Sequence, residues 1–109
     1  MGCMLAIRQH SFGPADVLRI EEVPDPEPGD DQLRIVVEAA GVHVLDTSIR
    51  AGESFGMMQR PELPMVPGRE VAGVVDAVGP GVGADWVGRR AVAHLGMTSG
   101  GYAERAVVS

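Results

Sequence analysis

Short apolar runs separated by turn-forming residues recur along the whole chain. The clearest is QLRIVVEAAGV at 32–42, where Leu33, Ile35 and Val37 fall on one face, as the two-residue period of a half-buried strand requires. Glycine and proline bound most of these runs, which is typical of strand ends. We therefore expect strands at 3–9, 17–23, 32–42, 71–78, 90–95 and 102–108.

The segment HVLDTSIRAG at 43–52 has a different spacing of apolar residues. Val44, Leu45 and Ile49 share one face of a short helix, and Gly52 suits its C-terminal cap. Many short strands with one or two short helices predict a mainly β fold, an antiparallel barrel or a sandwich.

Two further features of the pattern concern the backbone. Gly73 interrupts the strand expected at 71–78, which predicts a β-bulge or a close backbone contact. The segment PDPEPGDD at 24–31 cannot form regular structure, because its prolines lack backbone donors and force extended geometry on the residues before them. We expect a stiff surface connector there.

Composition places the chain among ordinary globular domains. Its 109 residues are 45% apolar, and 15 glycines with 8 prolines fit frequent turns better than a helical bundle. This length is enough for one domain with one hydrophobic core.

The charge and the cysteine content limit which binding partners and which cellular compartment are expected. Nine basic against fifteen acidic residues give a net charge of -6, and no basic cluster stands out, so neither nucleic acid nor a membrane surface is expected as a partner. Cys3 alone cannot form an internal disulfide or a multi-cysteine zinc site. The first residues contain no long apolar region for export. We expect a cytoplasmic protein.

One motif resembles a dinucleotide fingerprint. Gly79, Gly81 and Ala84 satisfy G-x-G-x-x-A directly after an expected strand. The fingerprint functions only where a helix begins and directs its N–H groups at a pyrophosphate, whereas a β-type run follows Asp85 to Gly88 here. We interpret the motif as a turn.

Four segments together resemble one protein family. AAGVHVLDTSIRAG, VPGREVAGVVDAVGPGV, VGRRAVA and GGYAERAVV stand in the order seen in medium-chain dehydrogenases/reductases, and they look most like the quinone oxidoreductase branch. The resemblance covers essentially the whole chain. It implies that residues 1–109 form the N-terminal catalytic domain, a GroES-like, partly open β-barrel with one or two short helices. The family's Rossmann domain and its C-terminal return segment are expected outside this chain, so the isolated domain should be inactive.

The resemblance also bears on metal binding. Zinc-dependent relatives carry a Cys after the GV of the first segment and a His-Glu pair in the second, and His43, Arg69 and Glu70 stand at those positions here. Arg69 cannot ligate a cation, because its guanidinium stays protonated and offers only donors. Leu45 occupies the place of a proton-relay hydroxyl. We expect no metal, although His43 and Glu70 with a third residue such as His94 remain an alternative ligand set.

The charged pair at the start of the strand at 71–78 has two interpretations. Arg69 either fills the volume of a metal and pairs with Glu70, Asp46 or a missing segment, or it points outward from the turn. Because adjacent strand residues face opposite sides, Glu70 inward and Arg69 outward is the simpler arrangement.

The resemblance suggests roles for several further residues. His43 replaces an Asn at the nicotinamide end of the cleft and would donate a hydrogen bond or a proton to a substrate oxygen, or else merely cap the helix. Asp46 would brace the helix and support the site. Ser48 stands where the family often has a Tyr, which implies a roomier pocket.

Together these arguments define the expected site. The catalytic set is His43, Asp46 and Glu70; the cofactor contacts are His43 and Ser48; the substrate pocket includes Ser48, Phe55 and Arg69. Met57 and Met58 either line the same mouth or pack the loop. His10, His94, Trp86 and Tyr102 are expected to be structural.

The resemblance implies NADPH-dependent, zinc-independent hydride transfer to a quinone or an α,β-unsaturated carbonyl (an enone). The partners are the small-molecule acceptor and the Rossmann domain, and a homodimer is left open. Two other hypotheses remain: a zinc-dependent alcohol dehydrogenase-like domain, and a non-catalytic GroES-like binding or assembly module.

Overall fold

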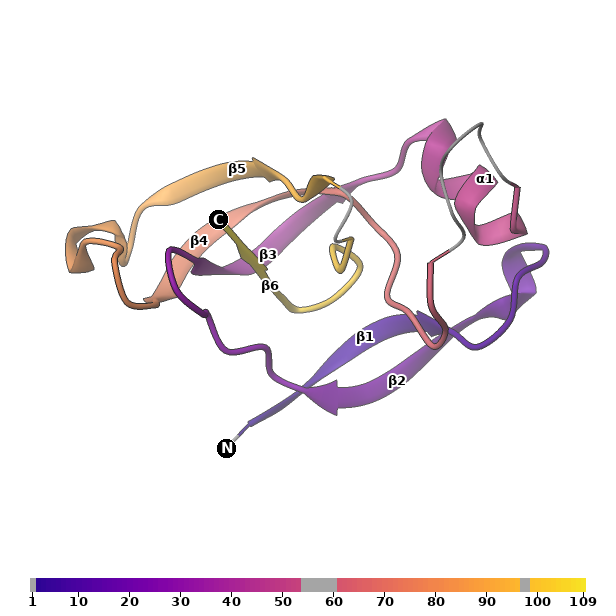
Figure 1. Ribbon diagram of the computed structural model, residues 1–109, viewed down its shortest axis with the longest axis horizontal. Helices are drawn as coiled ribbons and strands as arrows, with labels where there is room; N and C mark the ends of the chain where they lie inside the picture. Colours follow the sequence, from indigo (N-terminus) through magenta and orange to yellow (C-terminus); the bar gives the residue numbers. More distant parts are fainter. Residues whose placement is uncertain (1, 54–60, 97–98) are drawn as a thin grey trace.

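The computed structural model describes residues 2–53, 61–96 and 99–109. The elements follow the chain in the order shown in Figure 1. They are β1 (Cys3–Gln9), the 3-10 helix η1 (Ala15–Val17), β2 (Leu18–Pro24), β3 (Leu33–Gly41), α1 (Val44–Ala51), β4 (Glu70–Val78), the 3-10 helix η2 (Ala84–Trp86), β5 (Arg90–His94) and β6 (Arg105–Val108).

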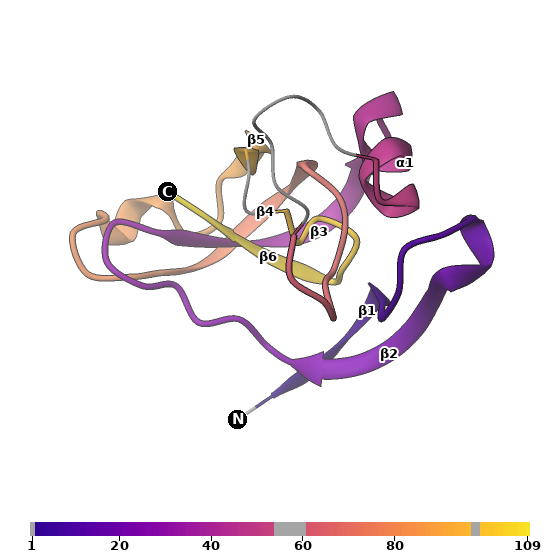
Figure 2. The same ribbon diagram turned by 45° about the vertical axis from the view of Figure 1, so that its right-hand side comes forward.

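The strands form two antiparallel sheets that curl toward each other. β1 pairs with β2, and the second sheet has the strand order β5-β4-β3-β6. β1 is also tied to segments that precede β4 and β6: Gln9 and Met65 exchange backbone hydrogen bonds of 2.9 and 3.0 Å, and Ile7 N–H donates to Tyr102 at 2.7 Å. Figure 2 shows the resulting open curl. The expected mainly β, partly open barrel is confirmed.

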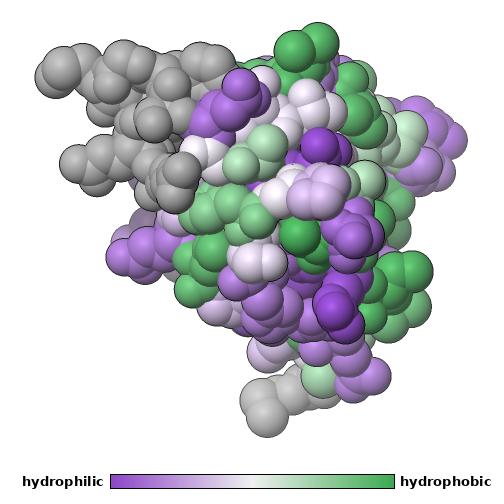
Figure 3. All heavy atoms as spheres, turned by 90° about the vertical axis from the view of Figure 1, so that its right-hand side faces the viewer, coloured by the Kyte–Doolittle hydropathy of each residue, from purple (hydrophilic) through white to green (hydrophobic). Residues whose placement is uncertain are grey.

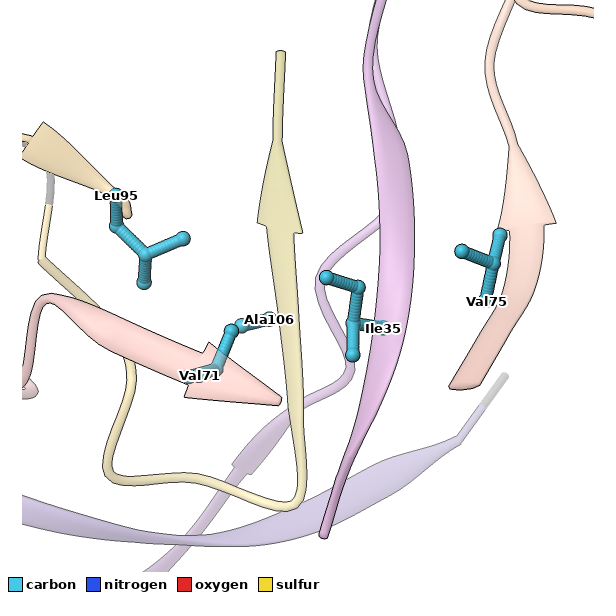
Figure 4. Packing of buried hydrophobic residues seen from close by; sticks show 5 residues of the cluster. All are labelled: Ile35, Val71, Val75, Leu95 and Ala106. Atoms are coloured by element: carbon cyan, nitrogen blue, oxygen red, sulfur yellow. The ribbon is translucent and has the colours of Figure 1, made fainter. Parts of the chain in front are cut away.

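The main hydrophobic core is formed by residues of the larger sheet. Ile35 is fully buried, and Val71 and Val75 are 1% exposed. Figure 4 shows their side chains with Leu95, which follows β5, and Ala106 of β6. Burying an aliphatic side chain of this size contributes about 1.5–3 kcal/mol, so these few residues fix how β3, β4 and β6 pack.

Gly73 of β4 lies where β3 approaches most closely. The pairing register of β3 and β4 shifts between Val37 and Ala39, which marks a bulge beside Gly73. A Cβ atom at Gly73 would collide with the backbone oxygen of Val36. Both features expected of this glycine are therefore present.

Only the strand expected at 3–9 has the expected bounds. Three others differ by one residue at one or both ends. Two differences change the description: Val17 belongs to η1, and the strand expected at 102–108 begins at Arg105. The second difference has a physical reason: Tyr102 and Ala103 pair with β1, whereas Arg105 onward pairs with β3. An apolar pattern does not reveal this change of partner.

The segments expected to be irregular are irregular except at Pro24, which is the last residue of β2 and pairs with Cys3. Residues 25–32 lie outside helices and strands, and the Arg34 guanidinium holds this connector by donating to the carbonyl oxygen of Pro26 at 3.2 Å. Residues 79–83 form a turn that leads into the three-residue η2, so no α-helix follows the dinucleotide-like motif. Among the described residues, no helix is long and apolar enough to cross a membrane.

Candidate functional site

The site is built around the first turn of α1. His43 is the N-cap residue, and its backbone N–H donates to Asp46 Oδ2 at 2.9 Å. A carboxylate suits this place because the first N–H groups of a helix lack partners within the helix. At the other end, Gly52 adopts the left-handed conformation with φ 87°, as expected for its cap.

Asp46 connects three separate parts of the chain. Its side chain is only 4% exposed. Besides the His43 N–H, Oδ2 accepts a hydrogen bond from the Tyr102 hydroxyl at 3.3 Å, while Oδ1 lies 3.8 Å from Arg69 Nε. Asp46 thus braces the first turn of α1, and its part in a functional site stays a prediction.

Of the two interpretations of the charged pair, the simpler one, with Glu70 inward and Arg69 outward, is wrong, and the pairing of Arg69 with Asp46 is the one present. Arg69 is buried, with its side chain 7% exposed, whereas the side chain of Glu70 is 43% exposed. The guanidinium is accommodated inside because Asp46 supplies a counter-charge and the Gly96 carbonyl oxygen accepts from Nη1. Adjacent residues do face opposite sides, but in the opposite sense to the one predicted.

Glu70 meets His43 at the rim of this buried pair. His43 Nε2 lies 3.6 Å from Glu70 Oε1, and both side chains are about half exposed. A Cβ atom at Gly41 would lie 2.6 Å from Glu70 Oε1, so the absence of a side chain there makes room for the carboxylate. The predicted catalytic set, His43, Asp46 and Glu70, thus comes together in space.

Few side chains at this site could ligate a metal ion. Among the described residues, no group of three or more His, Cys, Asp or Glu side chains is arranged to hold a metal. His94, the third ligand considered, accepts a hydrogen bond at Nδ1 from the Gly96 N–H at 3.0 Å. Since Arg69 also brings a buried positive charge to this place, the residues here do not fit a zinc ion.

Tyr102 is a site residue that the sequence did not indicate. Burial, the negative charge of Asp46 and the hydrogen bond to it raise the pKa of Tyr102 to about 12, so its hydroxyl remains a donor at ordinary pH. No spacing in the sequence links position 102 to position 46. The GGY triplet at 100–102 is a weak indication that Tyr102 packs closely against another segment. A tyrosine beside two glycines can approach a neighbouring backbone, as its ring does at Gly68.

A cavity of about 430 Å³ lies next to this network. Its walls come from the β1–β2 sheet, β3, α1 and residues 101–103, and they include Ile7, Leu18, Val37, Asp46 and Tyr102. His43, Ser48, Arg69 and Glu70 are not among its lining residues. Ser48 and Arg69, the described members of the predicted substrate pocket, therefore do not line this cavity.

The residues on either side of His43 in the chain are apolar and exposed. Val42 and Val44 on either side are 69% and 82% exposed. Figure 3, which looks onto the end of the molecule where α1 and the β1–β2 turn lie, shows hydrophobic and hydrophilic surface side by side. Such a rim suits a flat, uncharged ring that must also receive one hydrogen bond.

Two predicted pocket residues stay predictions. Ser48 is half-buried on α1, on the same helix as Asp46. Phe55, with Met57 and Met58, lies outside the described residues.

Comparisons with known proteins agree with this architecture. The family model described as "Alcohol dehydrogenase GroES-like domain" matches residues 29–109. Quinone oxidoreductase from Lama guanicoe is 42% identical over 107 residues, which are 97% of this chain and 31% of that protein. The chain thus spans about a third of the length of the curated relatives it matches.

Solved structures share the fold over nearly the whole chain. The human synaptic vesicle membrane protein VAT-1 homolog-like protein matches with a TM-score of 0.88 and 32% identity, covering 98% of this chain and 33% of that one. A mycobacterial protein complexed with NADPH matches with a TM-score of 0.82 and 42% identity, covering 96% and 31%.

A cobalt- and zinc-bound thermostable alcohol dehydrogenase from Pyrobaculum aerophilum also matches, with a TM-score of 0.81 and 29% identity, covering 98% of this chain and 39% of that one. The fold alone therefore does not distinguish metal-binding from metal-free relatives. The family model nevertheless matches more than half of the chain, and the sequence similarity to quinone oxidoreductases is higher. The chain belongs to the alcohol dehydrogenase GroES-like domain family, in the quinone oxidoreductase branch of the medium-chain dehydrogenase/reductase superfamily.

Proposed function

We propose that this chain forms part of the active site of a cytoplasmic, NADPH-dependent, zinc-independent oxidoreductase that reduces quinones or α,β-unsaturated carbonyls. In this proposal residues 1–109 are the GroES-like catalytic domain, and the Rossmann domain is supplied by sequence outside them. The observation that carries the proposal is the buried Arg69, paired with Asp46 at the position where zinc-dependent relatives have a histidine ligand.

The electrostatics of the site support the zinc-independent part of the proposal. A guanidinium offers donors only and keeps its charge at any ordinary pH, so it opposes a second cation in the same place. Asp46, which would otherwise attract a metal, is occupied by donors from Tyr102 and the His43 backbone.

The exposed rim supports the cofactor and the acceptor. His43 and Ser48 would hold the nicotinamide end of NADPH, and the apolar side chains of Val42 and Val44 suit its uncharged ring. When bound, NADPH supplies the hydride. The 42% identity to quinone oxidoreductase and the NADPH complex of a mycobacterial relative favour this pairing of cofactor and acceptor.

His43 would act on the acceptor oxygen. Its imidazole donates a hydrogen bond to the carbonyl oxygen, which gains negative charge as the acceptor is reduced, and can then pass it a proton. Glu70 Oε1, 3.6 Å from Nε2, orients the ring. Asp46 holds the backbone of His43 in place.

The test of the function is turnover by the full-length protein that carries this chain. We expect NADPH consumption that depends on an added quinone or enone and persists after chelator treatment. Dependence on zinc would favour an alcohol dehydrogenase instead, and the absence of turnover with every acceptor would favour a non-catalytic binding module.

A variant tests the role of Arg69 separately. Arg69→His restores the histidine found in zinc-dependent relatives and removes the buried cation, so we expect it to bind zinc more tightly than the unsubstituted protein does. Metal analysis of both proteins after dialysis against zinc measures this. Stoichiometric zinc in the unsubstituted protein would contradict the proposal.

A further inference from the structure

Donors lie on both sides of the Asp46 carboxylate. Oδ2 faces two donors, the Tyr102 hydroxyl at 3.3 Å and the His43 N–H at 2.9 Å. On the other side, Arg69 Nε lies 3.8 Å from Oδ1 and has no hydrogen-bond partner among the described residues. A buried donor without a partner costs free energy, so Arg69 favours rotation of the carboxylate toward itself.

We infer that Tyr102 is a positioning residue for His43, and that it acts by holding the Asp46 carboxylate toward the N-cap of α1. The inference rests on the proposed function, in which His43 contacts the acceptor. Without the tyrosine hydroxyl, the His43 N–H is the one partner that Asp46 retains on that side among the described residues, against a charged guanidinium on the other.

Tyr102 is well placed for this task. It lies in the segment that pairs with β1 just before β6 begins. Its backbone is fixed by hydrogen bonds to Ile7 and Pro67. Its ring packs against the turn at Gly68, one residue before Arg69, where a Cβ atom would lie 2.5 Å from Tyr102 Cδ1. The hydroxyl therefore has little freedom to leave Asp46.

Loss of the Tyr102–Asp46 hydrogen bond would affect His43 through its backbone N–H. Its ring is half exposed, and Glu70 Oε1 lies 3.6 Å from Nε2. A loosened N-cap allows the imidazole to move relative to the acceptor, and small displacements of a donor lower the rate of a step that depends on orientation.

The first test follows the contact without using activity. The full-length protein is labelled with 15N-histidine, and amide hydrogen exchange is measured for the unsubstituted protein and for Tyr102→Phe. We expect exchange at His43 to become about tenfold faster, as the loss of one hydrogen bond to a charged group predicts. His10 and His94 are internal controls, and Trp86→Phe, which changes an exposed aromatic in η2, is the matched control variant.

The second test follows the reaction. With NADPH and a quinone, Tyr102→Phe is expected to lower kcat about tenfold, equivalent to about 1.4 kcal/mol, while the KM for NADPH changes much less. Unchanged exchange at His43, or faster exchange at His43 with undiminished kcat, would overturn the inference. If the unsubstituted protein reduces no acceptor, the proposed function fails, and the exchange measurement alone then decides whether Tyr102 fixes the N-cap.

Discussion

At the scale of single residues, the molecule is organised around one buried ion pair. Asp46 and Arg69 have side chains 4% and 7% exposed, so each charge depends on the other and on a few hydrogen bonds. Such pairs contribute little net stability compared with an apolar pair of the same size, but removal of one partner is costly. This asymmetry can be measured.

Replacement of Asp46 by Asn leaves the Arg69 charge buried without a counter-charge. We expect the free energy of unfolding to fall by about 3–5 kcal/mol, measured by urea denaturation. The control is Glu38→Gln, which breaks the exposed pair with Arg90 and should cost at most about 1 kcal/mol. Equal effects of the two variants would show that the Asp46–Arg69 pair is not a buried one in solution.

Tyr102 provides a spectroscopic measure of the same site, because it is the only tyrosine in the chain. Its pKa is raised to about 12, first by burial and then by Asp46, so tyrosinate absorbance of the 109-residue chain should rise with a midpoint near that value. The folded pKa lies above the ordinary value of about 10. The difference between the folded and unfolded pKa of Tyr102 therefore contributes fully to the free energy of unfolding below about pH 10. That contribution is lost as the pH rises toward 12.

The same titration separates the causes of the shift. In Asp46→Asn the charge is removed while burial remains, so the midpoint should fall only part of the way toward the ordinary pKa. Circular dichroism recorded in parallel shows whether the chain stays folded. A midpoint near 10 in a folded, unsubstituted chain would rule out the Tyr102–Asp46 contact.

At the scale of elements, the pairing of β3 with β4 decides where the site lies. β4 begins at Glu70 directly beside Gly41, the last residue of β3, and this register brings Glu70 close to His43. The bulge at Gly73 adjusts the same pairing. The local pattern predicted both strands and the bulge or close contact at Gly73, since the alternation of apolar residues and the lack of a side chain are properties of the sequence.

Replacement of Gly73 by Ala tests this pairing. The new Cβ atom would meet the backbone of Val36, which cannot move aside like a flexible side chain, so we expect a loss of about 1–3 kcal/mol in urea unfolding. Gly83→Ala is the control, because its Cβ atom would meet only the movable carboxylate of Asp85. A Gly73→Ala protein as stable as that control would show that β3 and β4 are farther apart than described.

Element boundaries were less predictable than the elements themselves. The strand expected at 102–108 divides because Tyr102 and Ala103 pair with β1 and the following residues pair with β3. The apolar pattern is the same on both sides of that division. Only the positions of the two partner strands determine where one pairing stops and the next begins.

At the scale of the whole molecule, the site is assembled from segments far apart in the chain. The start of α1, Arg69 just before β4, Gly96 two residues after β5 and Tyr102 ahead of β6 meet around the Asp46–Arg69 pair. The curl of the sheets makes this meeting possible, because β1 binds the segments at 65 and 102–104 and closes that side of the barrel. The cavity of about 430 Å³ lies along the same seam.

The sequence by itself determined the strands apart from their ends, the helix at 44–51 with its Gly52 cap, the irregular connector that follows Pro24 and the inability of Arg69 to bind a metal. These follow from local steric preferences and from the chemistry of single side chains, which need no distant partner. Tertiary structure decided that Arg69 faces inward and Glu70 outward, that Tyr102 reaches Asp46, and that the strand at 102–108 changes partner. Those outcomes depend on which buried charge finds a counter-charge across the barrel, and that is a property of positions in space rather than of spacing along the chain.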